Sequence, residues 1–180
     1  IMILVVIAVI GILIGINKKG EKNTYSTNDM IQMVNTIYKD LEEELPSLET
    51  VAIDIQNMDE VTSYTGLQSN ENIESLVVSL PMMNAQAYSV AVVKVKETAN
   101  VETLKQEMLD NINMNRWICV SAEKLYITNS GNIIFLVMSS EDMAKPVYEG
   151  FKKYVNNQIG KELEKTNEEA VELPPEMIVE

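Results

Sequence analysis

Histidine is missing from this sequence of 180 residues, and cysteine occurs once. Without histidine the chain lacks the usual general base, both the Ser-His and the Cys-His nucleophile pairs, and the commonest metal ligand. A lone Cys119 can form neither an internal disulfide nor a multi-cysteine zinc site. These gaps exclude the most common catalytic and metal-binding chemistries and a disulfide-stapled scaffold.

Basic residues are also scarce. The chain has 14 Lys and Arg against 27 Asp and Glu, which gives a formal net charge of -13. A surface with this excess of negative charge repels phosphate backbones, and arginine, the residue best suited to phosphate, occurs only as Arg116. We therefore expect no nucleic-acid partner.

Residues 1–16 form an uninterrupted apolar run, IMILVVIAVIGILIGI. A helix of this length would be about 24 Å long, whereas a bilayer core is about 30 Å thick. Because the sequence starts with Ile, we expect the segment to be truncated at its start. The alternative is a buried core helix, but a helix apolar on every face at one end of the chain favours a membrane. We therefore predict a single-pass transmembrane anchor that binds the cell membrane.

The flank of this run carries Lys18, Lys19 and Lys22. It shows no small-x-small cleavage pattern and no cysteine for lipid attachment, so we expect the anchor to be retained. Orientation stays open, because the positive-inside rule compares two flanks and only one is present. We read residues 17–28 as a linker.

Helical periodicity begins after the linker. Apolar residues recur at helical spacing over residues 29–45, with Thr27 or Asn28 as the expected cap and Pro46 as the end. Residues 50–55 alternate weakly and predict a short edge strand, and residues 58–64 predict a short helix closed by Gly66.

From residue 73 onward a pattern of two strands and a helix occurs twice. The first unit has strands at 73–80 and 88–96 and a helix from about Asn100; the second has strands at 125–128 and 133–139 and a helix from about Asp142. We expect an α+β domain over residues 29–160, with a four-stranded antiparallel sheet made of two β-β-α units and two helices on one face. Residues 161–180 lose this periodicity and predict an acidic tail.

Alternation along the strands assigns faces to the predicted sheet. We expect Ala91, Val93 and Val95 to face the two helices together with Phe135 and Val137. The opposite face is too apolar to remain in water, so we expect the helix at 29–45 or another chain to cover it. The residues of that face, which are candidate partner contacts, are Val90, Val92, Ile134, Leu136 and Met138.

Further candidate contacts lie in the loops. Arg116 and Trp117 are adjacent and belong to residue types favoured at binding hot spots, although such a Trp also commonly seals a core. Met82 and Met83 suggest an adaptable contact surface or core filling. We expect Cys119 to be a small buried hydrophobe, with a reactive thiol as the alternative.

A family resemblance covers residues 29–157. It rests on SLPMMNAQAYSVAVVKVK in the 73–96 region, on residues 101–108 and on the strand at 133–138. These stretches resemble a bacterial domain family of unknown function from Gram-positive anaerobes, whose members usually follow a lipoprotein signal or a membrane anchor. The resemblance implies a membrane-tethered α+β domain facing the cell exterior, and it implies no activity. Lipidation is not implied, because no cysteine follows the apolar run.

Catalysis is not expected. Asp54, Asp59 and Glu60 show no spacing typical of a catalytic carboxylate pair, and the sequence has no phosphate-binding glycine loop and no calcium loop. We expect no cofactor and no metal. The leading hypothesis is a membrane-tethered, extracytoplasmic, non-catalytic interaction domain with a partner protein of the cell envelope. The alternative is a ligand-binding accessory or sensor domain with a pocket between the sheet and the helix at 29–45.

Overall fold

The computed structural model describes residues 25–41, 45–82 and 86–170. Within these residues the chain forms four α-helices and six β-strands. The helices are α1 (Thr27–Tyr38), α2 (Met58–Thr65), α3 (Val101–Asn111) and α4 (Glu141–Tyr154). The strands are β1 (Leu48–Ile53), β2 (Ile73–Pro81), β3 (Ser89–Val95), β4 (Lys124–Ser130), β5 (Ile133–Ser139) and β6 (Leu163–Thr166).

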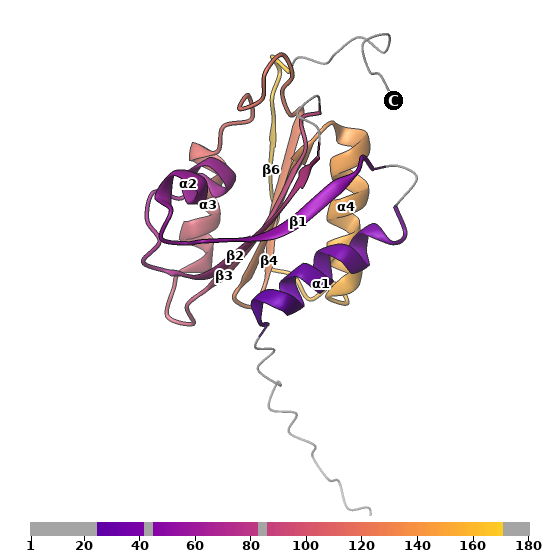
Figure 1. Ribbon diagram of the computed structural model, residues 1–180. Helices are drawn as coiled ribbons and strands as arrows, with labels where there is room; N and C mark the ends of the chain where they lie inside the picture. Colours follow the sequence, from indigo (N-terminus) through magenta and orange to yellow (C-terminus); the bar gives the residue numbers. More distant parts are fainter. Residues whose placement is uncertain (1–24, 42–44, 83–85, 171–180) are drawn as a thin grey trace, which may run out of the picture.

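The strands form one antiparallel sheet, which lies between the helices (Figure 1). Their order is β1-β2-β3-β5-β4-β6. Its centre is the pair β3 and β5, in which Val90 lies opposite Val137 and Val93 lies opposite Ile134. The hairpin from β4 to β5 turns at Gly131, whose φ is 57°, a left-handed conformation that favours glycine. β1 and β6 are the two edges.

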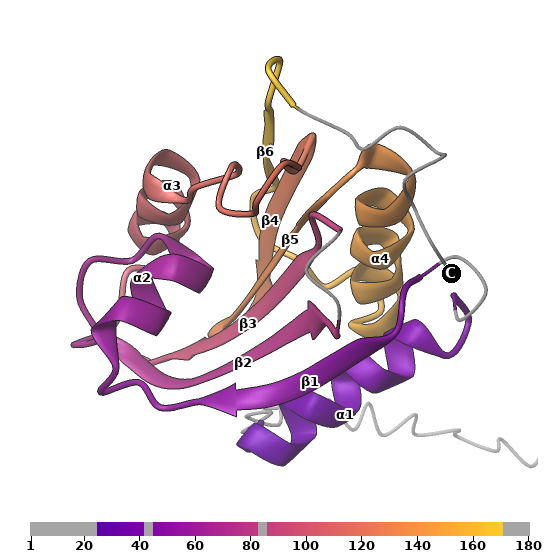
Figure 2. The same cartoon turned by 45° about the horizontal axis from the view of Figure 1, so that its top comes forward.

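Helices cover both faces of the sheet, with α2 and α3 on one side and α1 and α4 on the other (Figure 2). The α2/α3 side takes Ala91 and Val93 from β3 and Ile134 from β5 into one buried cluster. The α1/α4 side takes the alternate residues, among them Val92 and Phe135. The domain therefore has three layers with two hydrophobic cores.

The predicted four-stranded sheet with both helices on one face is wrong. The sheet has six strands, and α3 and α4 lie on opposite faces. The predicted grouping of Val93 with Val137 on one face is wrong for the same reason, since Val93 pairs with Ile134. Cross-strand partners share a face, and a strand that is apolar at every position does not reveal which face a helix covers.

The two strands that the predicted four-stranded sheet lacked, β1 and β6, form the two edges of the sheet. β1 lies where the short edge strand was expected, at Leu48–Ile53. β6 lies inside the segment predicted to be an acidic tail, and only its first residue, Leu163, packs against a core cluster. Backbone pairing with β4 holds β6 in the sheet. Its side chains are mostly polar, so the sequence shows no strand periodicity there.

Helix α1 starts and ends earlier than predicted. Ser26 caps it in place of Thr27 or Asn28: the backbone N–H of Asp29 donates to the Ser26 hydroxyl, and the Asp29 carboxylate accepts from the Ser26 backbone N–H. This is a capping box. The helix ends at Tyr38, and residues 42–44 of the predicted helix lie outside the described residues. The buried residues of this helix belong to the same cluster as Val90 and Val92. The expectation that Ile134, Leu136 and Met138 share that face is wrong, because they belong to the cluster on the other side of the sheet.

The transmembrane prediction falls on residues 1–16, which lie outside the described residues. Over residues 25–41, 45–82 and 86–170, no helix is both long and apolar enough to cross a bilayer. This finding corrects the predicted architecture, in which an anchor was part of the fold. The single-pass membrane location predicted with it is withdrawn.

One buried cation connects three parts of the chain. The Lys105 side chain on α3 is fully buried, and its ammonium donates to Asn129 Oδ1 at 2.7 Å and to the Lys161 carbonyl at 2.6 Å. It also pairs with Glu102 at 2.8 Å. Three acceptors match the three donors of a lysine ammonium. Lys105 therefore ties α3 to β4 and to the segment that leads into β6.

Two glycines allow a matched stability test. Gly66 and Gly131 both have positive φ, but a Cβ on Gly66 would lie 2.7 Å from the Ile112 backbone N, whereas nothing lies within 4 Å of a Cβ on Gly131. Gly131→Ala should cost about 1–2 kcal/mol, the usual penalty for a left-handed residue. Gly66→Ala should cost clearly more, because α3 must move. Urea unfolding of both variants measures this, and equal losses would contradict the tight contact between Gly66 and the end of α3.

Candidate functional site

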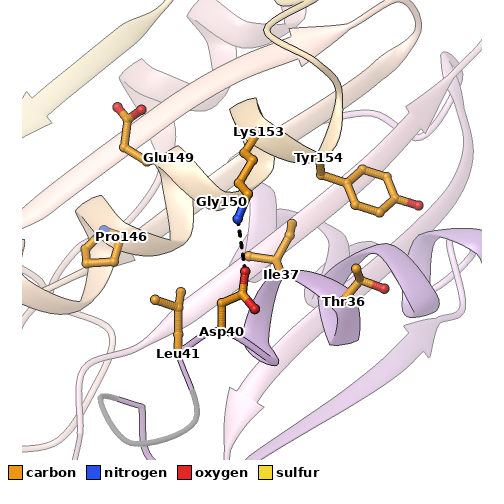
Figure 3. Close-up of a pocket in the computed structure, with 9 residues that line it drawn as sticks. All are labelled: Thr36, Ile37, Asp40, Leu41, Pro146, Glu149, Gly150, Lys153 and Tyr154. Atoms are coloured by element: carbon orange, nitrogen blue, oxygen red, sulfur yellow. Dashed lines mark hydrogen bonds and ion pairs between the residues drawn. The ribbon is translucent and has the colours of Figure 1, made fainter.

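A groove opens between α1 and α4, on the outer side of these two helices (Figure 3). We call it the α1–α4 groove, and its volume is about 380 Å³. The residues that line it are Thr36, Ile37, Asp40, Leu41, Pro146, Glu149, Gly150, Lys153 and Tyr154.

Gly150 sets the distance between the two helices. A Cβ at this position would lie 2.7 Å from Ile37 Cγ2, so only glycine allows α1 to pack this closely against α4 without a shift. Pro146, inside α4, adds an apolar ring to the wall. With Leu41 and Tyr154 completing the lining, the groove has a largely apolar interior.

Charged side chains lie at the rim of the α1–α4 groove. Lys153 Nζ on α4 pairs with Asp40 Oδ2 at 3.1 Å, and both side chains are exposed, at 80% and 74% (Figure 3). Glu149 pairs with Lys152 at 3.1 Å. An exposed ion pair contributes about 0–1 kcal/mol to folding, so these rim charges are free to exchange partners. The arrangement suits a ligand with an apolar body and polar edges.

A second hollow, beside β6, is lined by polar groups that bind one another. Tyr126 and Tyr148 stack with ring centroids 5.0 Å apart. The Tyr148 hydroxyl donates to Glu162 Oε2 at 2.8 Å, and Lys152 pairs with Glu162 at 3.3 Å. Burial and then the bond to Glu162 raise the pKa of Tyr148, and the same bond lowers the pKa of Glu162. These contacts join α4 to the segment before β6.

The five strand residues singled out as partner contacts are buried within the chain. Val90 and Val92 pack on the α1/α4 side, whereas Ile134, Leu136 and Met138 pack on the α2/α3 side. All five have an exposed fraction of 0%. Their apolar side chains are thus part of the two hydrophobic cores and are not accessible to a partner.

The loop candidates have different positions. Met82 is exposed at 71% just after β2, and Met83 lies outside the described residues. Cys119 is exposed and has a φ of 66°, so the expectation of a buried residue is wrong. A left-handed turn carries its side chain into solvent.

Arg116 and Trp117 lie in the loop between α3 and β4, on the α2/α3 side of the sheet. The Arg116 guanidinium carbon is 4.8 Å from the ring centroids of both Tyr64 and Trp117. Trp117 also packs partly against the α2/α3 core, which agrees with the core-sealing role considered for it, and its role as a partner contact stays a prediction. The structure does not bring Arg116 near the α1–α4 groove, which is on the opposite side.

The sequence did not predict the groove, because its two walls, at Ile37 and Gly150, lie more than 100 positions apart in the chain and their contact exists only in the folded structure. One local signal was present. An isolated glycine within the periodic pattern of a helix often marks a close packing contact, and Gly150 is such a residue.

No known protein family, curated protein or solved structure matches the chain. The resemblance to a bacterial family of unknown function therefore stays a prediction. In the described part of the chain, no group of three or more His, Cys, Asp or Glu side chains is placed to hold a metal ion.

Substitutions at two nearby positions of α4 test whether the rim of the groove contributes to stability as the core does. Lys153→Ala should change the free energy of unfolding by less than about 1 kcal/mol, because its ion pair is exposed. Phe151→Ala should cost about 3–5 kcal/mol, because Phe151 is fully buried and stacks on Phe135 at 4.3 Å. Chemical denaturation measures both, and a large loss for Lys153→Ala would mean that the rim is structural.

Proposed function

We propose that this domain is a non-catalytic interaction domain that binds a protein partner in the α1–α4 groove. The observation that carries the proposal is an apolar groove of about 380 Å³ between two helices, with charges at its rim. An apolar centre with a polar rim is the usual layout of a protein interface.

The occupant we favour is a large apolar side chain on a helix of the partner. Two helices form the walls of the groove, and an amphipathic helix laid along them would place one apolar residue against Leu41 and Pro146. Partner carboxylates or ammonium groups would then exchange with the Asp40–Lys153 pair. Such an exchange gives orientation and specificity more than affinity.

Charge supports a protein rather than a nucleic acid as the partner, since the chain carries -13. The expectation that the partner belongs to the cell envelope depends on the anchor predicted at residues 1–16. Those residues lie outside the described part of the chain, and the groove itself indicates no location for the partner.

A small ligand is the second candidate occupant. Small-molecule pockets usually measure about 300–1,000 Å³, and the groove falls at the lower end of that range. The ligand pocket was expected between the sheet and the first helix, but α1 packs directly on the sheet there through Met33 and Val34. The α1–α4 groove is the site that supports this alternative.

Site-specific photo-crosslinking distinguishes the partner. A benzophenone amino acid at Thr36, in the groove, should crosslink a recurrent protein in cells, and the same group at Gln106, exposed on α3, should not. Leu41→Glu, which places a charge in the apolar wall, should reduce the Thr36 product by at least about fivefold. Equal products from Thr36 and Gln106, or a product insensitive to Leu41→Glu, would contradict the proposal.

A thermal-shift screen tests the small ligand. Compounds with an apolar body and one charged group should raise the melting temperature of the wild-type chain, and Leu41→Glu should abolish the rise. A ligand that binds only the folded state stabilises it by RT ln(1 + L/Kd), where L is the free ligand concentration, so the rise in melting temperature grows with ligand concentration. A flat response across the screen would remove the support for this alternative.

A further inference from the structure

The guanidinium of Arg116 is a half-buried cation with few partners. It donates one hydrogen bond, from Nη1 to the Ser63 carbonyl at 3.2 Å, and lies 4.8 Å from the ring centroids of Tyr64 and Trp117. A guanidinium has five N–H donors. Among the residues that the structure describes, no carboxylate lies within ion-pair distance of it.

Lys105, the fully buried cation, differs from Arg116 in its partners. Lys105 has three acceptors, one of them a carboxylate, for its three donors. Burial lowers the pKa of Arg116 from 12.5 to about 10, and Tyr64 opposes part of that shift. The group is therefore charged at neutral pH, partly desolvated and, among the described residues, without a carboxylate in ion-pair range. An anion that reaches it gains a strong charge-assisted hydrogen bond.

An exposed apolar side chain lies next to this cation in the loop. Ile118 is exposed at 83%, the highest value among the large hydrophobic residues described. The loop is held on both sides, since Met114 and Val120 are buried and the Ala122 N–H donates to the Met114 carbonyl at 2.8 Å. The Ile118 side chain is therefore accessible to the surface of a partner.

We propose that Tyr64, Arg116, Trp117 and Ile118 form a second binding site, which recognises an acidic residue flanked by apolar residues on a partner protein. The planar carboxylate matches the fork of the guanidinium, and both aromatic rings hold that fork in place. The flanking apolar residue packs on Ile118. A carboxylate is favoured over a phosphate because the chain already carries -13 and repels a second negative charge.

The two sites are on opposite sides of the sheet. The α1–α4 groove belongs to the α1/α4 side, whereas Tyr64 on α2 and Trp117 pack against the α2/α3 core. One domain can therefore hold two partner segments at once. The second site does not depend on the first, and each proposal can fail alone.

Unique NMR signals report on this site. Since the chain has one Arg and one Trp, the Arg Nε–H and the Trp indole N–H each give one signal. Titration of the full chain with the peptide acetyl-Leu-Glu-Leu-amide should shift both signals with saturation. The glutamine analogue, acetyl-Leu-Gln-Leu-amide, should bind at least about tenfold more weakly, because it loses the charge-assisted pair.

Variants distinguish the contribution of the Arg116 guanidinium to peptide binding from the effect of net charge. Arg116→Lys should weaken peptide binding at least about fivefold, because the ammonium keeps the charge but loses the bidentate fork. Lys145→Gln is the matched control for Arg116→Gln, since Lys145 is exposed at 61% on α4 and both changes remove one positive charge. Only Arg116→Gln should weaken binding, and backbone spectra report whether each variant folds. Leu41→Glu, in the groove, should leave peptide binding unchanged.

Four outcomes would overturn this proposal. Equal binding of the two peptides would show that the carboxylate is not read, and tighter binding of inorganic phosphate would assign the site to another anion. Equal losses for Arg116→Gln and Lys145→Gln would reduce the effect to net charge. Shifts of the Arg and Trp signals by Glu172→Gln or Glu176→Gln, without peptide, would show that the chain's own acidic residues occupy Arg116. A Leu41→Glu chain that fails in crosslinking but binds the peptide would separate the two proposals.

Discussion

The central strands β3 and β5 are buried on both faces, and the rest of the fold depends on this constraint. Every residue of β5, Ile133–Ser139, is buried, and so are all residues of β3 except Lys94. A sheet that is apolar on both sides must be covered twice, because a bare apolar face of this size is not stable in water. The four described helices divide between the two sides for this reason. The α1–α4 groove lies between the helices of one side, and Arg116 lies in a loop that contacts α2 on the other.

Polar contacts then fasten the outer elements to this centre. Lys105 links α3 to β4 and to the carbonyl of Lys161, and Tyr148 links α4 to Glu162. Both contacts reach the segment that leads into β6, whose side chains bury little apolar surface. Because edge strands have few hydrophobic contacts, such hydrogen bonds and the ladder to β4 decide where β6 lies. The Tyr148 and Glu162 groups that line the hollow beside β6 are therefore engaged in structural interactions, whereas the Asp40 and Lys153 charges of the α1–α4 groove are exposed.

Local features were predictable where they depend on neighbouring residues. The strands at β2, β3, β4 and β5, the Asn100 cap of α3, the Gly66 end of α2 and the Gly131 turn agree with the sequence. The Asn100 side chain accepts from the Thr103 N–H, which is the contact expected of such a cap. The groove was not predictable in the same way. It requires Ile37 and Gly150 to meet, and no periodicity within either helix specifies that contact.

By itself, the sequence determined that histidine and multi-cysteine chemistry are excluded, that the surface is acidic, and where most helices and strands begin and end. These properties follow from residue types and from spacing along one element. Tertiary structure alone decided the face that each helix covers, because consecutive apolar residues in β3 and β5 suit either face. It alone also decided that Arg116 lies between Tyr64 and Trp117 without a carboxylate in ion-pair range among the described residues. Desolvation and pairing of a charge depend on residues distant in sequence, so only the packed chain shows how each cation of the described residues is paired.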